Sequence, residues 1–310
     1  MPTNFPEMWL RRVETNLTQE DMAPWLEGIE EIDTEILEVG SGAASEQNVI
    51  HLPVSEFEPD VLINNSSYPI ALQAYSDDEV TIQLDKYQTK VVTLSDDQAM
   101  GASYRRIDQA TNATTQAILK KKYGRAIHSI APADDSANTP VLLTTGGPNE
   151  LRVGTRLRLV YEDLVAFAKE CDDLQIPMEG RRLVLCNDHW NDLLLDRENF
   201  GDQLVNYKKG TPAPEICGFQ IMKYVNNPYY TGTEKNAYGA VPEAGDYRAS
   251  VFFYVPNIAK KTGLTKQYFT PSAQDPQNQT NKLAYRHYYI VVPKRDMYIG
   301  AIVSGTYVAP

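Results

Sequence analysis

The sequence has few cysteines and few histidines, and neither residue type is spaced as in a known chemical site. Its three cysteines are an odd number without a CxxC pair, which favours reduced thiols over a disulfide framework or a zinc site: Cys171, Cys186 and Cys217. The four histidines form no HExxH motif or equivalent ligand spacing: His51, His128, His189 and His287. We therefore predict no catalytic, cofactor-binding or metal-ligating residue.

Other catalytic patterns are also missing, namely GxSxG, GxGxxG and DxDxDG, and the Gly/Ser stretch at 40–45 lacks the lysine of a phosphate-binding loop. His189 follows Cys186 across an expected strand-to-helix turn, and we interpret it as a helix-surface residue. The acidic clusters at 77–79 and 172–173 are interpreted as solvent-exposed residues at breaks between secondary-structure elements. A loose divalent-cation site is the alternative. The sequence predicts a protein that is not an enzyme.

Long apolar runs and excess positive charge are absent too. No run approaches 18 apolar residues, and the first 12 residues lack the apolar core of a signal peptide. We expect no membrane span and a reducing, cytosol-like compartment. With 29 Lys and Arg against 41 Asp and Glu, the net charge of −12 argues against a surface devoted to nucleic acid. It fits a soluble protein, or a wall that does not adhere to an enclosed polyanion.

What the chain does contain is a substantial potential core, since 42% of its 310 residues are hydrophobic. An apolar stripe from Leu157 to Leu174 predicts a helix that Pro177 and Gly180 end. A buried strand at 182–186 follows, and then a short helix that Asn187 or Asp188 caps; it should bury Trp190, Leu193 and Leu194. The result is a compact α/β core in which no catalytic or ligand-binding residue is recognised.

Residues 1–93 read as an arm followed by an extended hairpin. In the acidic arm, 1–48, short helices are expected at 9–13 and 24–39. Residues 49–93 are rich in alternating and β-branched residues, with a turn at 64–67. Because two strands without a third are marginal in water, the hairpin must lie on its own domain or on a neighbouring subunit. Its length favours the neighbour.

Residues 95–124 give the clearest helix. Ser95 and Gln98 form a capping box, and Gly124 is a suitable C-terminal cap. The basic triplet 120–122 complements the helix dipole in this interpretation, with phosphate contact as the alternative. The weakly apolar, Thr-rich stripe predicts that the helix lies across a sheet.

The rest of the chain alternates strands and loops. Strands are expected at 141–144, 219–225, 250–255, 285–293 and 297–307. Between two of them, residues 226–248 form a polar insertion rich in Tyr and Gly. Tyrosine is enriched in protein interfaces because it supplies contact area at low entropic cost, so this insertion is a candidate contact surface.

The order of arm, hairpin, long helix and α/β domain, together with IPMEGRRLVLCNDHWNDLLLDRENF at 176–200, resembles the major capsid proteins of tailed bacteriophages, which have the Hong Kong 97 fold. The resemblance covers about 49–307 and implies an α+β fold. It assigns an N-terminal arm (1–48), an extended loop called the E-loop (49–93), a peripheral domain with a spine helix (94–155), a mainly axial domain (156–255) and a return to the peripheral domain (256–310).

The resemblance implies a coat protein that assembles through pentamers and hexamers into an icosahedral head around double-stranded DNA, without sequence-specific DNA binding. It places the protein in the virion, assembled in the host cytoplasm, with a portal, decoration or head-completion proteins and no membrane. A 48-residue arm is too short for a fused scaffolding domain, so a separate scaffolding protein is implied. The expected inter-subunit contacts lie in the E-loop (Asn64, Asn65, Tyr68, Tyr75 and Lys86) and the axial loops (Tyr229, Tyr230 and Tyr238).

Two other interpretations stay open. One keeps the fold but makes the protein the shell of an encapsulin-like bacterial compartment that houses cargo enzymes. The other is a cytosolic α/β enzyme with a site assembled from scattered residues. Some relatives cross-link covalently through an E-loop lysine; here the first lysine is Lys86, on the returning arm of the hairpin, so cross-linking at the loop tip is not expected.

Overall fold

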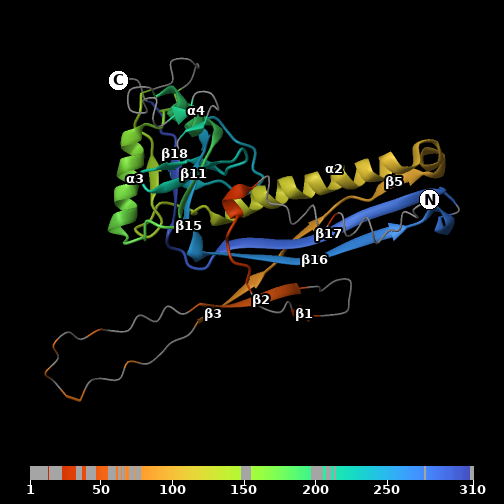
Figure 1. The fold of residues 1–310 in the computed structure, drawn as a ribbon, viewed down its shortest axis with the longest axis horizontal. Helices are drawn as coiled ribbons and strands as arrows, with labels where there is room; N and C mark the ends of the chain where they lie inside the picture. The colour runs from red at the N-terminus through yellow and green to blue at the C-terminus, as the bar shows by residue number, and fades with distance from the viewer. Residues whose placement is uncertain are drawn as a thin grey trace. The chain divides into compact units, whose positions relative to one another are not determined.

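The computed structural model describes residues 13, 23–32, 37–39, 47–54, 61, 64, 66, 68–69, 73, 78–147, 155–196, 205–206, 211–212, 214–275 and 277–307. The chain divides into two compact units (Figure 1). The larger comprises residues 1–31 and 86–310, and the smaller comprises 32–85.

A six-stranded mixed sheet forms the centre of one half of the larger unit, with strand order β10-β11-β7-β15-β18-β6. Strand β7 pairs in parallel with β11 and antiparallel with β15, while β6 pairs in parallel with β18. Side chains alternate between its two faces, as the pleat of a strand requires. The strands are β6 (Val141–Leu143), β7 (Arg181–Leu185), β10 (Glu215–Ile216), β11 (Phe219–Lys223), β15 (Ser250–Tyr254) and β18 (Ile299–Val303).

Helices α3 (Tyr161–Asp173) and α4 (Asn187–Leu195) contribute to the core on one face of this sheet (Figure 1). At its centre the rings of Phe167, Phe219 and Phe252 pack with centroids 5.4–5.9 Å apart. The predicted helix–strand–helix core is therefore present. Its cap differs, because the Cys186 sulfur accepts from the His189 amide and Cys186 is the N-cap of α4.

The other face of the sheet packs against the end of the long helix α2 (Asp96–Ile130) and an N-terminal segment. In that segment the short 3₁₀ helix η1 (Pro24–Leu26) buries Trp25 edge-on against Tyr224 and Phe253, at centroid distances of 5.5 and 6.4 Å. Arg182 donates to the carbonyl oxygens of Trp25 and Glu27 at 2.9 and 2.6 Å. This part of the arm thus belongs to the core.

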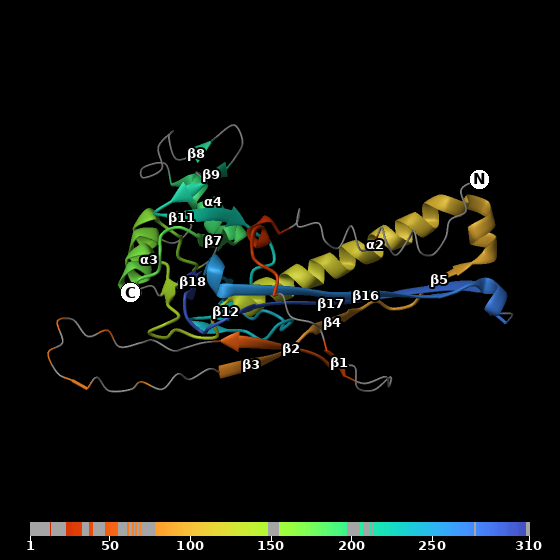
Figure 2. The ribbon, with the colours of Figure 1, turned by 60° about the horizontal axis from the view of Figure 1, so that its bottom comes forward.

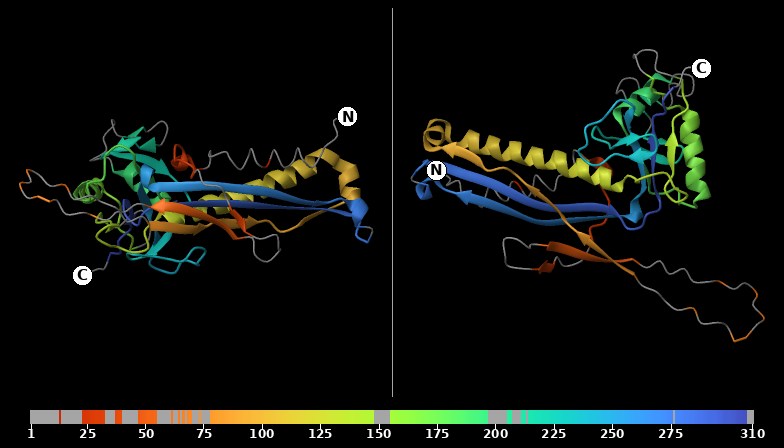
Figure 3. Two further views of the ribbon diagram at one scale, coloured as in Figure 1. Left: turned by 90° about the horizontal axis from the view of Figure 1, so that it is seen from below. Right: turned by 180° about the vertical axis from the view of Figure 1, so that it is seen from behind.

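The long helix continues alongside a second sheet of extended strands, as Figures 2 and 3 show. Its order is β16-β17-β4, and β5 also pairs with β17. A bulge interrupts the β16–β17 register between Thr262 and Thr265. The strands are β4 (Asp85–Gln88), β5 (Val92–Ser95), β16 (Ile258–Thr270) and β17 (Thr280–Pro293), with 3₁₀ turns η2 (Val255–Asn257) and η3 (Ser272–Gln274) at the ends of β16. The expectation that the helix lies across a sheet is confirmed.

Two small sheets complete the larger unit. Strands β12 (Tyr229–Thr231), β13 (Glu234–Lys235) and β14 (Asp246–Arg248) form one sheet, in the order β13-β12-β14. Strands β8 (Val205–Asn206) and β9 (Thr211–Pro212) form the other.

The smaller unit contains a three-stranded antiparallel sheet of β1 (Leu37–Val39), β2 (Gln47–Val54) and β3 (Asp78–Gln83), in that order. Part of the hairpin predicted at 49–93 is present as β2 and β3, which pair from Val49–Gln83 to Val54–Asp78. The rest of that range differs, because β4 and β5 pair with β17 in the larger unit. The expectation of a bare two-stranded ribbon was wrong, because β1 adds a short third strand.

Two further sequence expectations need correction, and one strand was not predicted. The helix expected at 24–39 is a 3₁₀ turn and, within the described residues, the separate strand β1. Helix α2 does not end at Gly124 but continues to Ile130, because its last turns are apolar and pack into the core. Strand β16 was missed, since its sequence is polar and one of its faces is only half-buried. The helix expected at 9–13 lies outside the described residues, apart from Val13, which is helical.

Candidate assembly surfaces

The Tyr-rich insertion at 226–248 folds onto the C-terminal end of α2. The Tyr230 hydroxyl donates to the carbonyl oxygen of Pro132, just beyond the helix, and the Tyr238 hydroxyl donates to that of Lys121 at 3.1 Å. The backbone N–H of Lys235 donates to Ala133 at 2.8 Å. The insertion is therefore attached to the helix end at several points.

Lys235 makes the most direct of these attachments. Its ammonium donates to the carbonyl oxygens of His128 (3.0 Å) and Ala131. Carbonyls at a helix C-terminus lack partners within the helix and carry partial negative charge, so a cation there both satisfies and stabilises them. Burial, with a smaller contribution from the positive charge of Arg125, lowers the pKa of Lys235 to about 8.

Asn227 anchors the other end of the insertion to the central sheet. Its side-chain nitrogen donates to the carbonyl oxygens of Val184 in β7 and Ala249 beside β15, both at 2.9 Å. Asn227 is almost fully buried. The insertion is thus hydrogen-bonded both to the six-stranded sheet and to the end of α2.

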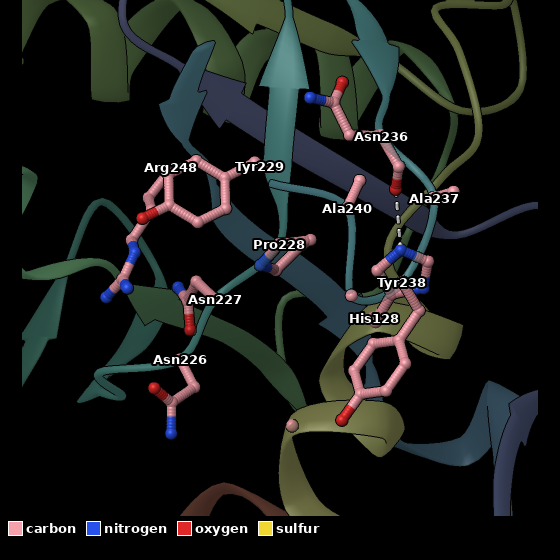
Figure 4. Close-up of a pocket in the computed structure, with 12 residues that line it drawn as sticks. His128, Asn226, Asn227, Pro228, Tyr229, Asn236, Ala237, Tyr238, Ala240 and Arg248 are labelled. Atoms are coloured by element: carbon pink, nitrogen blue, oxygen red, sulfur yellow. Dashed lines mark hydrogen bonds between the residues drawn. The ribbon is translucent and has the colours of Figure 1, made fainter. Parts of the chain in front are cut away.

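A pocket of about 170 Å³ opens between α2 and the insertion (Figure 4). Its walls include His128, Pro228, Tyr229, Tyr238 and Arg248. The His128 ring packs edge-on against Tyr238 at 5.4 Å and donates from Nε2 to the carbonyl oxygen of Asn236 at 2.8 Å. Burial lowers the pKa of His128, which keeps the ring neutral at pH 7.

An arginine guanidinium lies over the ring of each of the two pocket tyrosines. Arg248 lies 5.0 Å from the ring centroid of Tyr229, and Arg125 lies 5.3 Å from that of Tyr238. Arg248 also donates to the carbonyl oxygen of Val225. Such cation–π contacts attract a guanidinium to the face of the ring. Sequence analysis missed Arg248, His128 and Lys235, since nothing local in sequence marks them.

The structure separates the three predicted axial-loop tyrosines. Tyr229 and Tyr238 line the pocket, and 41% of Tyr238 is exposed. Tyr230 has no exposed surface and bonds within its own chain. A side chain enclosed in its own core cannot reach another subunit, so the contact predicted for Tyr230 is withdrawn.

The predicted E-loop residues fall in different places. Asn64 has φ of 53°, a conformation that asparagine tolerates at turns, and 78% of Tyr68 is exposed. Lys86 is exposed on β4 in the larger unit rather than on β3, the returning strand of the hairpin. Asn65 and Tyr75 lie outside the described residues.

The sequence predicted that His189 lies on a helix surface, but the residue is fully buried. Its Nδ1 lies 2.7 Å from the Ser250 hydroxyl and its Nε2 lies 2.9 Å from the Ser304 hydroxyl. Ser304 also accepts from Arg156, which forms a two-bond ion pair with Asp192 at 2.7 Å. This buried network joins α4 to the strand ends of the sheet, and its closed position favours a structural role over a catalytic one.

The basic triplet at 120–122 also differs from expectation. It does not complement a helix end, because α2 runs two turns further. Lys120 and Lys121 are exposed, but Lys122 is buried with its ammonium 4.0 Å from the centre of the Tyr289 ring. At the 172–173 cluster, Asp172 is solvated as expected and also pairs with Arg181 at 2.7 Å. Within the described residues, no group of three or more potential metal ligands comes together.

No helix in the described part of the chain is long and apolar enough to span a membrane. No curated protein matches the sequence. A family model described as phage capsid protein matches residues 77–304, which span α2, both large sheets and the insertion.

Solved structures with similar folds include several capsids. Mycobacterium phage Che8 aligns with a TM-score of 0.55 and 12% identity over 94% of this chain and 90% of that one. The mature capsid of bacteriophage PhiM1 aligns at 0.59 and 12% over 83% and 82%. A virus-like particle from Pyrococcus furiosus aligns at 0.55 and 10% over 96% and 98%. The family match and these folds confirm the predicted α+β architecture, and the chain belongs to the phage capsid protein family, with a fold of the Hong Kong 97 type.

Proposed function

We propose that this major capsid protein forms pentamers and hexamers that close into the icosahedral head of a tailed phage around double-stranded DNA. A phage capsid protein is a structural part of the virion and associates with copies of itself. The observation that carries the proposal is the family match over 77–304, together with the helix, sheets and separate small unit found here. Closed shells form cooperatively, because each subunit makes several modest contacts.

The small unit and the insertion are the surfaces we assign to these contacts. The exposed Tyr68, with Asn64, Asn65, Tyr75 and the neighbouring Lys86, would serve from the E-loop side. Tyr229 and Tyr238 would serve from the insertion. In this proposal residues 94–155 and 256–310 act as the peripheral domain and 156–255 mainly as the axial domain.

The proposed assembly takes place in the host cytoplasm with a separate scaffolding protein, a portal, and decoration or head-completion proteins. The subunit itself performs no catalysis. Its net charge of −12 favours weak repulsion of the enclosed DNA over binding.

Electron microscopy tests the proposal directly. Purified protein, alone and co-expressed with its scaffold, should give capsomers or closed icosahedral particles. A protein that stays monomeric in every condition would refute it. Nuclease treatment of particles from infected cells, before and after opening, should show protected DNA inside.

The fold also resembles the Pyrococcus furiosus virus-like particle, so an encapsulin-like compartment is the second candidate. Fold similarity at this level does not separate the two roles, since the TM-score of this particle equals that of the Mycobacterium phage Che8 structure. The phage capsid family match favours the head. Particles that contain a cargo enzyme instead of DNA would reverse this order.

A further inference from the structure

The pocket between α2 and the insertion combines two features that recur at the centres of protein interfaces. Its walls include Pro228 and three aromatic rings, those of Tyr229, Tyr238 and His128, beside polar asparagine residues. It also carries a guanidinium, Arg248, held against one of the tyrosines (Figure 4). Tyrosine and arginine are enriched among the residues that dominate binding energy, especially where they surround a small pocket.

The charges around the pocket point to an anionic ligand. None of the described residues that line it is an aspartate or glutamate. Asp246, two residues from Arg248 in sequence, already accepts from Thr231, Asn236 and the backbone of Glu243 at 2.6–2.8 Å. Arg248 lies in the wall, and Arg125 lies behind Tyr238. A guanidinium matches a carboxylate with two parallel hydrogen bonds, which makes the carboxylate its best partner.

From these observations we infer that the pocket receives an aspartate or glutamate side chain from a second copy of this chain. The size fits, since about 170 Å³ accommodates one side chain rather than a large ligand. The charge fits as well, because each copy carries 41 acidic residues against 29 basic ones and so presents excess carboxylates. The inference rests on the proposed shell, in which every subunit meets identical neighbours.

A DNA phosphate is the competing anion. The subunit's net charge of −12 disfavours it, since an acidic protein repels the polyanion over a Debye length. The braced geometry also favours a protein partner, because the pocket's walls are held by α2 and the central sheet through Lys235 and Asn227. A preformed pocket lowers the entropic cost of each contact in a repeated lattice.

Photo-cross-linking identifies the occupant. Tyr238→p-benzoylphenylalanine places a reactive group in the pocket wall, keeps an aromatic ring beside His128 and Arg125, and removes the hydrogen bond to Lys121. Irradiated shells should give a covalent dimer whose linked peptide contains an aspartate or glutamate next to the cross-linked position. The matched control is the same replacement at Met178, which is exposed but does not line the pocket and should not give this peptide. A link to DNA, a link within one chain, or a linked peptide without an acidic residue would overturn the inference.

A pair of arginine variants measures the charge requirement. Arg248→Gln should raise the critical concentration for assembly about tenfold, and Arg248→Lys should recover only part of that loss, because an ammonium keeps the charge but cannot form the two parallel hydrogen bonds. Thermal unfolding of each variant verifies that the subunit still folds, and an unchanged critical concentration in a folded Arg248→Gln protein would overturn the inference. Shells that form with the pocket empty contradict this inference alone, whereas a wild-type protein that never assembles contradicts the proposed function.

Discussion

The ammonium of Lys235 lies 3.0 Å from the backbone oxygen of His128, in the last turn of the 35-residue helix α2. Residue 235 belongs to an insertion more than a hundred positions further along the chain. This bond joins the end of the helix to the insertion, while Asn227 joins the insertion to the central sheet. The two halves of the larger unit are therefore braced at the edge of the pocket.

Replacing Lys235 tests this brace. Lys235→Met keeps most of the apolar stem but leaves two carbonyl oxygens without their partner, which should lower the free energy of unfolding by about 1–3 kcal/mol. Urea titration of the soluble subunit measures the change. Lys120→Met, at an exposed position on the same helix, is the control and should change it by less than about 0.5 kcal/mol. Equal effects of the two substitutions would mean that the contact does not stabilise the subunit.

Trp25 tests whether the arm segment belongs to the core. The side chain is fully buried between Tyr224 and Phe253, so Trp25→Ala should cost about 3–5 kcal/mol of stability. Thermal or urea unfolding measures this loss. Glu30→Ala, at an exposed position of the same segment, should be nearly neutral. A small effect of Trp25→Ala would show that residues 23–31 are not part of the folded core in solution.

The two buried histidines predict acid sensitivity. Burial lowers the pKa of both His189 and His287 to about 3, while an unfolded histidine titrates near 6.5. Since the unfolded chain then binds more protons, stability is full above about pH 6.5 and falls as the pH drops toward 3. Each histidine should cost about 1–2 kcal/mol by pH 5.

Urea unfolding at pH 7 and pH 5 measures this loss. His189→Asn retains a polar side chain within reach of the network but removes the titration, so its pH dependence between 7 and 5 should be about half that of the wild type. His51→Asn, on strand β2 of the smaller unit, is the matched control. A His189→Asn protein with the full wild-type slope would show that His189 does not cause the acid sensitivity.

Covalent cross-linking between subunits is not expected. The first lysine of the chain is Lys86. It lies on β4, a strand of the four-stranded sheet in the larger unit, and not in the hairpin of the small unit. Boiled and reduced particles should therefore migrate as a single band of about 35 kDa, the mass of one chain, on a denaturing gel. A ladder of larger bands would contradict this.

Local sequence patterns predicted much of the larger unit. The apolar spacing at 164, 167 and 171, the short apolar run within 182–186 and the capping signal at Ser95 each depend on neighbours in sequence. The elements that they predict are α3, β7 and the start of α2. Strand β16 and the extension of α2 to Ile130 were not predictable in this way, because contacts with distant segments stabilise them.

The assembly of residues into sites was decided by the tertiary structure alone. The sequence determined that the chain has no recognisable catalytic motif, an acidic balance and a Tyr-rich insertion. Only folding revealed that Tyr230 lies in the core while Tyr238 faces a pocket, and that His189 is enclosed by Ser250 and Ser304. The physical reason is that burial and hydrogen bonding depend on residues that are distant in sequence and adjacent only in the folded chain.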